Sequence, residues 1–179
     1  MIIGNKVRLR DKRLSDARND YKWQTNPELV RLDAMPLLTT SFPKYLLDYT
    51  AALHYPTPTR HTLAIETFDG KHIGNCVYYN INATEDEAEL GIMIGDGDCW
   101  DKGYGTDAIA TFVNHIFRQT NLKRLHLKTL DWNQRAQKCF QKSGFTPYGH
   151  RTRDGYNFVL MELHRKQWEE KRGEIKDRG

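Results

Sequence analysis

Apolar and polar residues alternate over several short stretches of the chain, and these stretches predict strands. Residues 6–10 read KVRLR, which is typical of a half-buried strand. Three runs rich in strand formers follow later, at residues 61–67, 71–80 and 87–94. Short polar segments separate them, Asp69-Gly70 first, and separators of this kind are typical of hairpins. The three runs therefore predict an antiparallel meander. Two further strands are expected at 123–128 and 156–163.

Other stretches carry apolar residues at every third or fourth position, which predicts helices. The strongest such stripe follows Thr106 and consists of Ile109, Phe112, Val113, Ile116 and Phe117. Ser15 and Asp16 offer N-caps for a more polar helix that Asn26-Pro27 ends. Two more helices are expected over residues 42–53 and 133–141.

The order of these elements predicts the fold class. The helix after Thr106 connects the strands at 87–94 and 123–128, and such a crossover makes the two strands parallel. The expected fold is mixed α/β: a single, mostly antiparallel sheet flanked by helices. We assign residues 1–164 to this domain. Residues 165–179 are charged and nearly without apolar side chains, so they predict a helical extension that frays or a terminal tail.

Composition limits the classes of function. With 39% hydrophobic and 28% charged residues among 179, the chain has the make-up of one globular domain. No apolar run approaches the roughly 20 residues that span a bilayer, and the N-terminus lacks a signal-peptide pattern. We therefore expect a cytoplasmic protein with no membrane partner. Three widely spaced cysteines and no HxH or HxxxH pair predict neither disulfides nor a metal site.

A basic net charge of +4 raises the question of nucleic acid. The segment after His164 holds six basic and four acidic residues, which accounts for +2 of the total. No basic stripe interleaved with aromatic residues occurs elsewhere, so we expect no nucleic-acid partner.

Residues 98–108, DCWDKGYGTDA, place two glycines and a lysine directly before the strongest helix. The N–H groups and dipole of a helix N-terminus favour an anion, and Lys102 adds a positive charge. The turn does not fit a Walker A loop because Lys102 precedes Gly103. It does not fit the dinucleotide fingerprint either, since Trp100 stands where the third glycine belongs. The turn therefore predicts either an anion site or a glycine-bearing helix cap.

A second motif, NQRAQKCFQKSGF at residues 133–145, follows the turn. Together the two resemble the Gcn5-related N-acetyltransferases (GNAT), and specifically the branch similar to RimJ and RimL, which acetylate the N-termini of ribosomal proteins. The pyrophosphate loop of that family usually reads Arg or Gln, two residues, Gly, one residue, Gly or Ala. Here residues 100–105 take its place, with Trp100 as a departure. AELGIMIGD at residues 88–96 resembles the strand that cradles the pantetheine arm.

The resemblance implies the GNAT fold, acetyl-CoA as cosubstrate and no metal. It implies that main-chain amides hold the pyrophosphate, those of Lys102, Gly103, Tyr104, Gly105 and Thr106. It implies that Ile92, Met93 and Ile94 pair with the pantetheine arm through their backbone, with N–H groups on the Met93 side as an oxyanion site. The Asn133 side chain is expected near the same arm. Asn133 is equally suited to cap its helix, and the two roles are compatible.

The catalytic residues are matched less completely. Glu89 is placed where family members often use an acidic residue to deprotonate the amine through water; its alternative role is that of a solvated strand carboxylate. The usual general acid, a tyrosine seven residues after the asparagine, is Phe140 here. Cys139, Ser143 and Tyr156 are candidates to replace it.

Two functions remain open. The first is acetyl transfer to a primary amine: a protein or peptide N-terminus, an amino acid, or a small amine such as a polyamine or aminoglycoside. The second is a non-catalytic acetyl-CoA-binding domain, which Phe140 motivates. We expect the acceptor pocket between residues 19–53 and a loop at 146–156. Dimers are common in the family, so a homodimer is one possible assembly.

Overall fold

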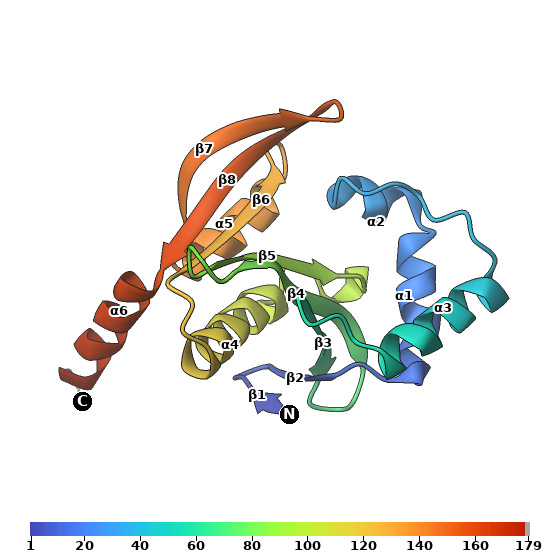
Figure 1. The fold of residues 1–179 in the computed structure, drawn as a ribbon, viewed down its shortest axis with the longest axis horizontal. Helices are drawn as coiled ribbons and strands as arrows, with labels where there is room; N and C mark the ends of the chain where they lie inside the picture. Colours follow the sequence, from blue (N-terminus) through green and yellow to red (C-terminus); the bar gives the residue numbers. More distant parts are fainter. Residues whose placement is uncertain (178–179) are drawn as a thin grey trace.

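The structure is a computed structural model that describes residues 1–177. Eight strands form one sheet in the order β1-β2-β3-β4-β5-β6-β8-β7 (Figure 1). Their bounds are β1 Ile2–Ile3, β2 Val7–Asp11, β3 Arg60–Thr67, β4 His72–Asn82, β5 Glu87–Ile94, β6 Arg124–Leu130, β7 Thr146–Arg153 and β8 Tyr156–His164. The helices are α1 Ala17–Gln24, α2 Pro27–Leu32, α3 Phe42–His54, α4 Tyr104–Gln119, α5 Gln134–Lys142 and α6 Arg165–Asp177. None of the helices within residues 1–177 is long and apolar enough to cross a membrane.

The predicted mixed sheet is confirmed. Every neighbouring pair of strands is antiparallel except β5 and β6, which the crossover helix α4 connects in parallel. That parallel pairing is short, because it ends at Glu89 and His126. Beyond this point β5 pairs only with β4, and β6 pairs only with β8. The two central strands therefore part, and the backbone of residues 91–94 has no strand partner on its β6 side.

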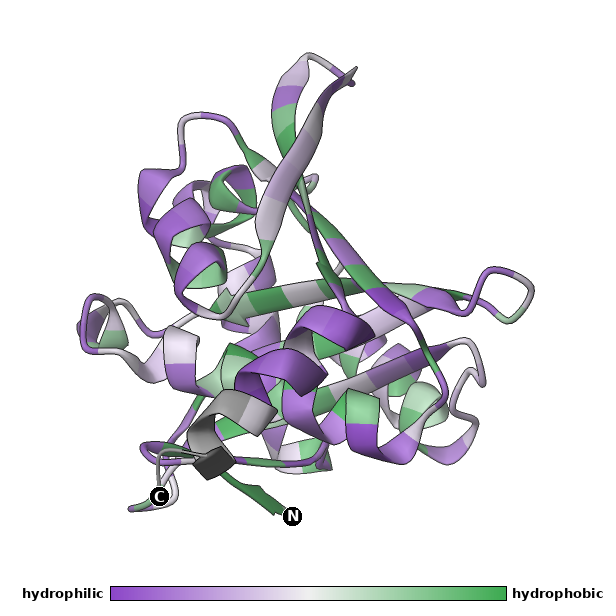
Figure 2. Cartoon of the chain, turned by 90° about the vertical axis from the view of Figure 1, so that its left-hand side faces the viewer, coloured by the Kyte–Doolittle hydropathy of each residue, from purple (hydrophilic) through white to green (hydrophobic). Residues whose placement is uncertain are grey.

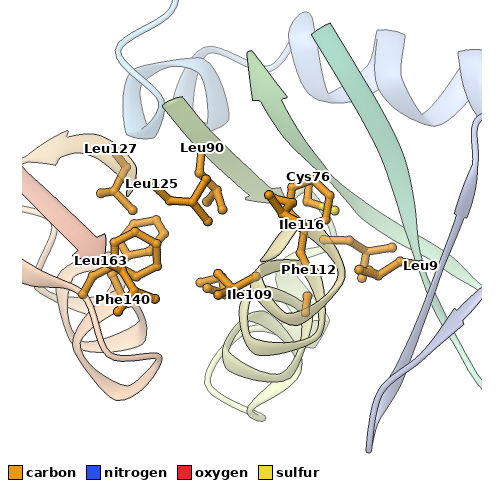
Figure 3. Packing of buried hydrophobic residues seen from close by; sticks show 14 of the residues in the cluster. Leu9, Cys76, Leu90, Ile109, Phe112, Ile116, Leu125, Leu127, Phe140 and Leu163 are labelled. Atoms are coloured by element: carbon orange, nitrogen blue, oxygen red, sulfur yellow. The ribbon is translucent and has the colours of Figure 1, made fainter. Parts of the chain in front are cut away.

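The hydrophobic core lies between the sheet and α4. The predicted stripe of α4 is buried, and Ile109, Phe112 and Ile116 are each at most 1% exposed. In Figure 3 Ile109 lies on the side of Leu90 of β5 and Leu125 of β6, whereas Phe112 and Ile116 lie beside Cys76 of β4 and Leu9 of β2. Burying one such side chain stabilises the fold by roughly 1.5–3 kcal/mol, so the stripe holds α4 firmly on the sheet. In Figure 2 apolar segments lie along the central strands, whereas polar segments cover the outer helix surfaces.

Two predicted elements differ in the structure. The Asn26-Pro27 pair ends α1 as expected, but it also begins α2, because the Asn26 side chain accepts the N–H groups of Glu28 and Leu29. The expected loop at 146–156 is strand β7 and a hairpin turn. Asp154 and Gly155 both have positive φ there, 52° and 80°, and Asp-Gly is a common hairpin pair.

The two ends of the chain contain a strand and a helix. The short strand β1 was not predicted, and it pairs with β2. The charged segment after residue 164 forms helix α6 as far as Asp177. Residues 178–179 of the predicted extension lie outside the described residues.

Candidate active site

A cleft of about 1350 Å³ follows the gap between β5 and β6. One end is lined by the turn before α4 and by one side of α5. The other end is lined by α1, α2, α3 and the first residues of β3. The glycine turn, the parted strands and the first three helices thus share one continuous space.

Seven of the nine residues expected to bind the cofactor line this cleft: Ile92, Met93, Ile94, Gly103, Gly105, Thr106 and Asn133. Lys102 is exposed beside the turn, and Tyr104 packs partly against the core. The structure therefore brings the two sequence motifs together.

The turn before α4 has the shape of an anion site. Gly103 is the N-cap of the helix and has a φ of 82°, and Asp101 before it has a φ of 58°. The first N–H groups of any helix have no partner within it, and those of α4 begin at Tyr104, next to the cleft. Lys6 donates from Nζ to the carbonyl oxygen of Lys102 at 2.8 Å and holds the turn. The positive φ explains why glycine stands at this position.

Trp100, the departure from the usual loop, has two contacts. Its Nε1 donates to the carbonyl oxygen of Ile94 at 2.8 Å, which ties the loop to the end of β5. The Arg135 guanidinium lies 3.9 Å from the centre of the Trp100 ring. Trp100 thus positions an arginine at the cleft where the family usually has Arg or Gln in the loop itself.

Basic side chains of α5 at the cleft were missed in the sequence. Arg135, Lys138 and Lys142 all line it. Their spacing of three and four residues puts them on one helix face, and this spacing in the second motif was the available signal. Together they place three positive charges near the glycine turn.

The main chain of β5 presents polar groups to the cleft. Gly95 N donates to Ile73 O at 2.9 Å, and Ile94 lies opposite Gly74 in the ladder. Because residues of an antiparallel strand alternate in the direction of their polar groups, those of Ile92 and Ile94 point to the open side. Those of Met93 point towards β4, so the expectation that the Met93 backbone pairs with the arm or forms an oxyanion site is wrong: the alternation of the ladder commits its polar groups to Asn75. The Ile94 carbonyl oxygen accepts the hydrogen bond from Trp100 Nε1. The N–H of Ile94 and the N–H and carbonyl of Ile92 have no partner in a neighbouring strand.

Asn133 caps α5, as its alternative role required. Its Oδ1 accepts the N–H of Ala136 at 3.2 Å. The side chain nevertheless lines the cleft, and its Nδ2 is not used in the cap. Capping and ligand binding are therefore compatible.

Glu89 lies beside the large cleft rather than on its wall. It is 9% exposed and lines a separate cavity of about 180 Å³. Its carboxylate accepts from Lys128 Nζ at 2.8 Å and from Asn80 Nδ2 at 3.1 Å. Burial alone raises the pKa of Glu89, but hydrogen bonds from Lys128 and Tyr79 outweigh it and hold the pKa below its ordinary value. Glu89 is thus ionised at neutral pH. Lys128 lines both cavities and Tyr79 lines the large cleft, so these two hydrogen-bond partners connect Glu89 to the large cleft.

The three candidates for the general acid differ in whether they line the cleft. Phe140 is 6% exposed and packs edge-on against Phe145. The Ser143 hydroxyl donates to the carbonyl oxygen of Cys139, and neither Ser143 nor Tyr156 lines the cleft. Cys139 does line it, 3.3 Å from Thr106 Oγ1, and burial raises the pKa of its thiol. Of the three candidates, Cys139 alone is a protonated group at the cleft.

The acceptor end has an aromatic wall. Trp23, Tyr45 and Tyr49 line it, and the two tyrosine rings lie 5.8 Å apart. Asp33 lines the same end, whereas Asp48 points away and pairs with Lys44. Helices α1 to α3 contribute as expected, but β7 does not: Phe158 of β8 is the residue from this hairpin that lines the cleft.

A buried polar network lies behind this wall. Asp20 is 4% exposed and accepts hydrogen bonds from Asn75 at 2.7 Å and Tyr49 at 2.9 Å, and it pairs with Lys12 at 2.8 Å. Burial lowers the pKa of Lys12 despite this carboxylate. The carboxylate of Asp20 is fully engaged, so it stabilises the wall rather than offering a free charge.

Trp23 is held in place by a glycine. A Cβ at Gly95 would lie only 2.1 Å from the Trp23 ring, whereas a Cβ at Gly97 would meet nothing within 4 Å. We expect Gly95→Ala to destabilise the protein by about 1–3 kcal/mol, because overpacking forces the indole to move. Urea unfolding measures this, with Gly97→Ala as the matched control. Equal stability of the two variants would contradict the contact.

Comparison with known proteins decides the family. A profile of the acetyltransferase (GNAT) domain matches residues 6–146. The chain belongs to the GNAT acetyltransferase family. Members of this family use acetyl-CoA, so the chain is an acetyl-CoA-dependent N-acetyltransferase with the fold that the sequence predicted. The comparisons do not bear out the RimJ and RimL branch in particular.

Individual GNAT relatives are distant. An uncharacterized N-acetyltransferase, p20, from Bacillus licheniformis is 23% identical over 171 residues, which cover 90% of this chain and 96% of the relative. Spermidine N-acetyltransferase from Vibrio cholerae, solved with CoA and spermine, superposes with a TM-score of 0.81 at 19% identity and covers 90% of this chain and 97% of its own. Aminoglycoside acetyltransferase AAC(6′)-Ib, solved with coenzyme A, has a TM-score of 0.76 at 19% identity over 93% and 99%. These similarities show the shared fold.

Proposed function

We propose that this GNAT enzyme transfers the acetyl group directly to a primary amine that enters between α1, α2 and α3. The observation that carries the proposal is the single cleft that joins the glycine turn to the aromatic wall through the parted strands. In the transfer, the amine nitrogen bonds to the thioester carbon, and the carbon–sulfur bond breaks with its electron pair on sulfur. The amine loses one proton and the CoA sulfur gains one.

The cofactor half of the proposal assigns the pyrophosphate to the amides of residues 102–106. The helix dipole of α4 and the cations of α5 support this assignment. The pantetheine arm takes the place of the missing strand beside Ile92 and Ile94, because backbone groups that leave water need partners. Asn133 Nδ2 donates to the same arm.

In the proposed mechanism Glu89 deprotonates the amine indirectly. Its low exposure and its hydrogen bonds to Lys128 and Tyr79 support action through these two side chains and a water molecule, rather than direct contact with the amine. Cys139 is our candidate for protonating the departing thiolate. An ordinary thiol pKa of about 8.5 makes a thiolate a tolerable leaving group even unassisted, so Phe140 slows the reaction and does not prevent it.

The acceptor is the least constrained part. The resemblance to RimJ and RimL supports a protein N-terminus, while the solved complexes with spermine and the aminoglycoside enzymes support polyamines or aminoglycosides. The charges of the acceptor end favour neither polycation. Lys12 and Lys128 are paired with carboxylates. Burial raises the pKa of Asp33 to about 7, and Arg60 adds a positive charge. An acceptor with one amine and an apolar body fits this end better. We place the reaction in the cytosol, where the three free cysteines stay reduced.

Release of the CoA thiol tests the proposal. Incubating the protein with acetyl-CoA and a panel of amino acids, dipeptides, spermidine and kanamycin is expected to release thiol with at least one amine, and mass spectrometry is expected to find the acetylated product. The second candidate function, a non-catalytic domain, is favoured by Phe140. It predicts acetyl-CoA binding in a calorimetric titration with no thiol release from any amine, and that result would overturn our proposal.

A further inference from the structure

One row of side chains crosses the sheet beneath the acceptor end of the cleft. Arg60 of β3 lies opposite Tyr79 of β4, and Tyr79 lies opposite Glu89 of β5. Residues that are paired in a sheet share a face. Arg60, Tyr79 and Lys128 line the same cleft, so the row leads from the mouth at β3 to the place where β5 and β6 part.

Arg60 differs from the other cations of this end. Lys12 pairs with Asp20, and Lys128 pairs with Glu89, each at 2.8 Å. Arg60 forms no ion pair with any residue whose side chain the structure describes. Arg60 is exposed, and its guanidinium lies 5.2 Å from the centre of the Tyr79 ring, a contact that favours an orientation along the row. Among the side chains described at the acceptor end, Arg60 is therefore the cation without a counter-ion, whereas Arg135 stacks on Trp100 at the cofactor end.

We infer that Arg60 binds a carboxylate of the acceptor, so that the substrate class is an amine that carries a carboxylate a few bonds from its amino group, such as an α-amino acid. The inference rests on the proposed function. A guanidinium binds a carboxylate through two parallel N–H groups, which gives geometric specificity as well as affinity. Strands are spaced about 4.8 Å apart, so the Arg60 backbone lies about 10 Å from β5. Its long side chain covers much of that distance, which leaves room for a short acceptor.

Asp33 at the acceptor end suits the amino group of such a substrate. Asp33 lines the cleft and forms no ion pair with the side chains described. Burial raises the pKa of Asp33 to about 7, so this carboxyl group is about half ionised at neutral pH and more fully ionised above it. A carboxylate near the mouth attracts the ammonium form of an amine, and the aromatic wall accommodates an apolar side chain. A guanidinium and a carboxylate in one cleft match a zwitterion better than a polycation.

Matched acids and amides test the inference. L-leucine and L-leucinamide, and L-phenylalanine and its amide, differ only at the carboxyl group. The amides have the more acidic ammonium groups, so they are the better acceptors unless a group on the enzyme binds the carboxylate. We expect the wild type to favour the acids by at least about tenfold in kcat/KM. In Arg60→Gln the acid-to-amide ratio of kcat/KM is expected to fall by about tenfold or more. Arg60→Lys keeps the positive charge but not the two parallel N–H donors, and it is expected to retain part of the preference for the acids.

Arg153→Gln is the matched control, because Arg153 lies on the β7 hairpin beside Asp154 and does not line the cleft. Its acid-to-amide ratio is expected to equal that of the wild type, and thermal unfolding checks that all variants are folded. A wild type that prefers the amides, or an Arg60→Gln variant that lowers both substrates equally, would overturn the inference.

Binding separates this inference from the proposed function. Calorimetric titration of L-leucine into the protein with CoA bound is expected to give a weaker Kd for Arg60→Gln than for the wild type by about tenfold. If no amine releases thiol but this difference is found, the carboxylate site stands and the transferase proposal fails. If thiol is released but neither the acid-to-amide ratio nor the Kd of L-leucine changes in Arg60→Gln, the transferase proposal stands and the carboxylate site is wrong.

Discussion

Gly103→Asp is expected to weaken acetyl-CoA binding by at least two orders of magnitude while the protein remains folded. Gly103 is the N-cap of α4 and lines the cleft at the turn where we place the pyrophosphate. A carboxylate there lies next to the phosphates, and two like charges about 4–5 Å apart repel by roughly 3–4 kcal/mol at an effective dielectric constant near 20. Calorimetric titration of acetyl-CoA into wild type and variant measures the loss.

The control for this experiment is Gly103→Asn. Both variants place a side chain at a φ of 82° and close to Lys6, where a Cβ would lie 3.1 Å from Nζ. Asn and Asp tolerate this backbone conformation better than other residues, so the two share the steric cost and differ in charge. We expect Gly103→Asn to bind clearly better than Gly103→Asp. Unchanged binding in Gly103→Asp would place the pyrophosphate elsewhere.

Asp16→Ala is expected to destabilise the protein by about 3–5 kcal/mol, the range for breaking a buried ion pair on one side. Arg10 donates to both carboxylate oxygens of Asp16, at 2.8 and 2.9 Å, and the side chains of the two are 6% and 3% exposed. The Arg13 N–H donates to the same carboxylate. Alanine leaves the Arg10 guanidinium with Glu66 as its remaining buried carboxylate. Urea unfolding at pH 7 measures the change.

The same residue predicts a pH dependence. Burial alone raises the pKa of Asp16, but the hydrogen bonds from Arg10 and Arg13 outweigh it and lower the pKa to about 2. Because the unfolded value is near 3.8, Asp16 contributes about 2 kcal/mol above pH 4, and this is lost as the pH falls from about 4 to 2.

Unfolding curves between pH 7 and pH 2 test this dependence. Asp16→Asn, which cannot ionise, is expected to lose less stability over the acid range than the wild type. Asp48→Asn is the control, since Asp48 is exposed beside Lys44 and is expected to keep the wild-type profile. Parallel profiles for wild type and Asp16→Asn would show that another carboxylate dominates.

Local patterns accounted for most of the elements and for the cofactor half of the site. The stripe of α4 and the alternation of the strands reflect which side chains face the core, and this is written in the spacing of residues. Gly103 and its neighbours form a turn whose conformation depends on adjacent residues, so the motif was recognisable. Strand β7 was missed although Asp154-Gly155 marks its turn, because its residues are exposed on both faces and show little alternation.

The sequence by itself determined the mixed fold, the parallel crossover and the positions of the two motifs, since each depends on periodicity or on neighbouring residues. Only the tertiary structure decided where β5 and β6 part, that Glu89 faces Lys128 rather than the open cleft, and that Arg60 keeps an unpaired guanidinium. These features bring together residues that are far apart in the sequence: Arg60 and Glu89 are 29 positions apart, and Glu89 and Lys128 are 39 positions apart. Their charge states and exposure follow from packing and burial, which no local pattern encodes.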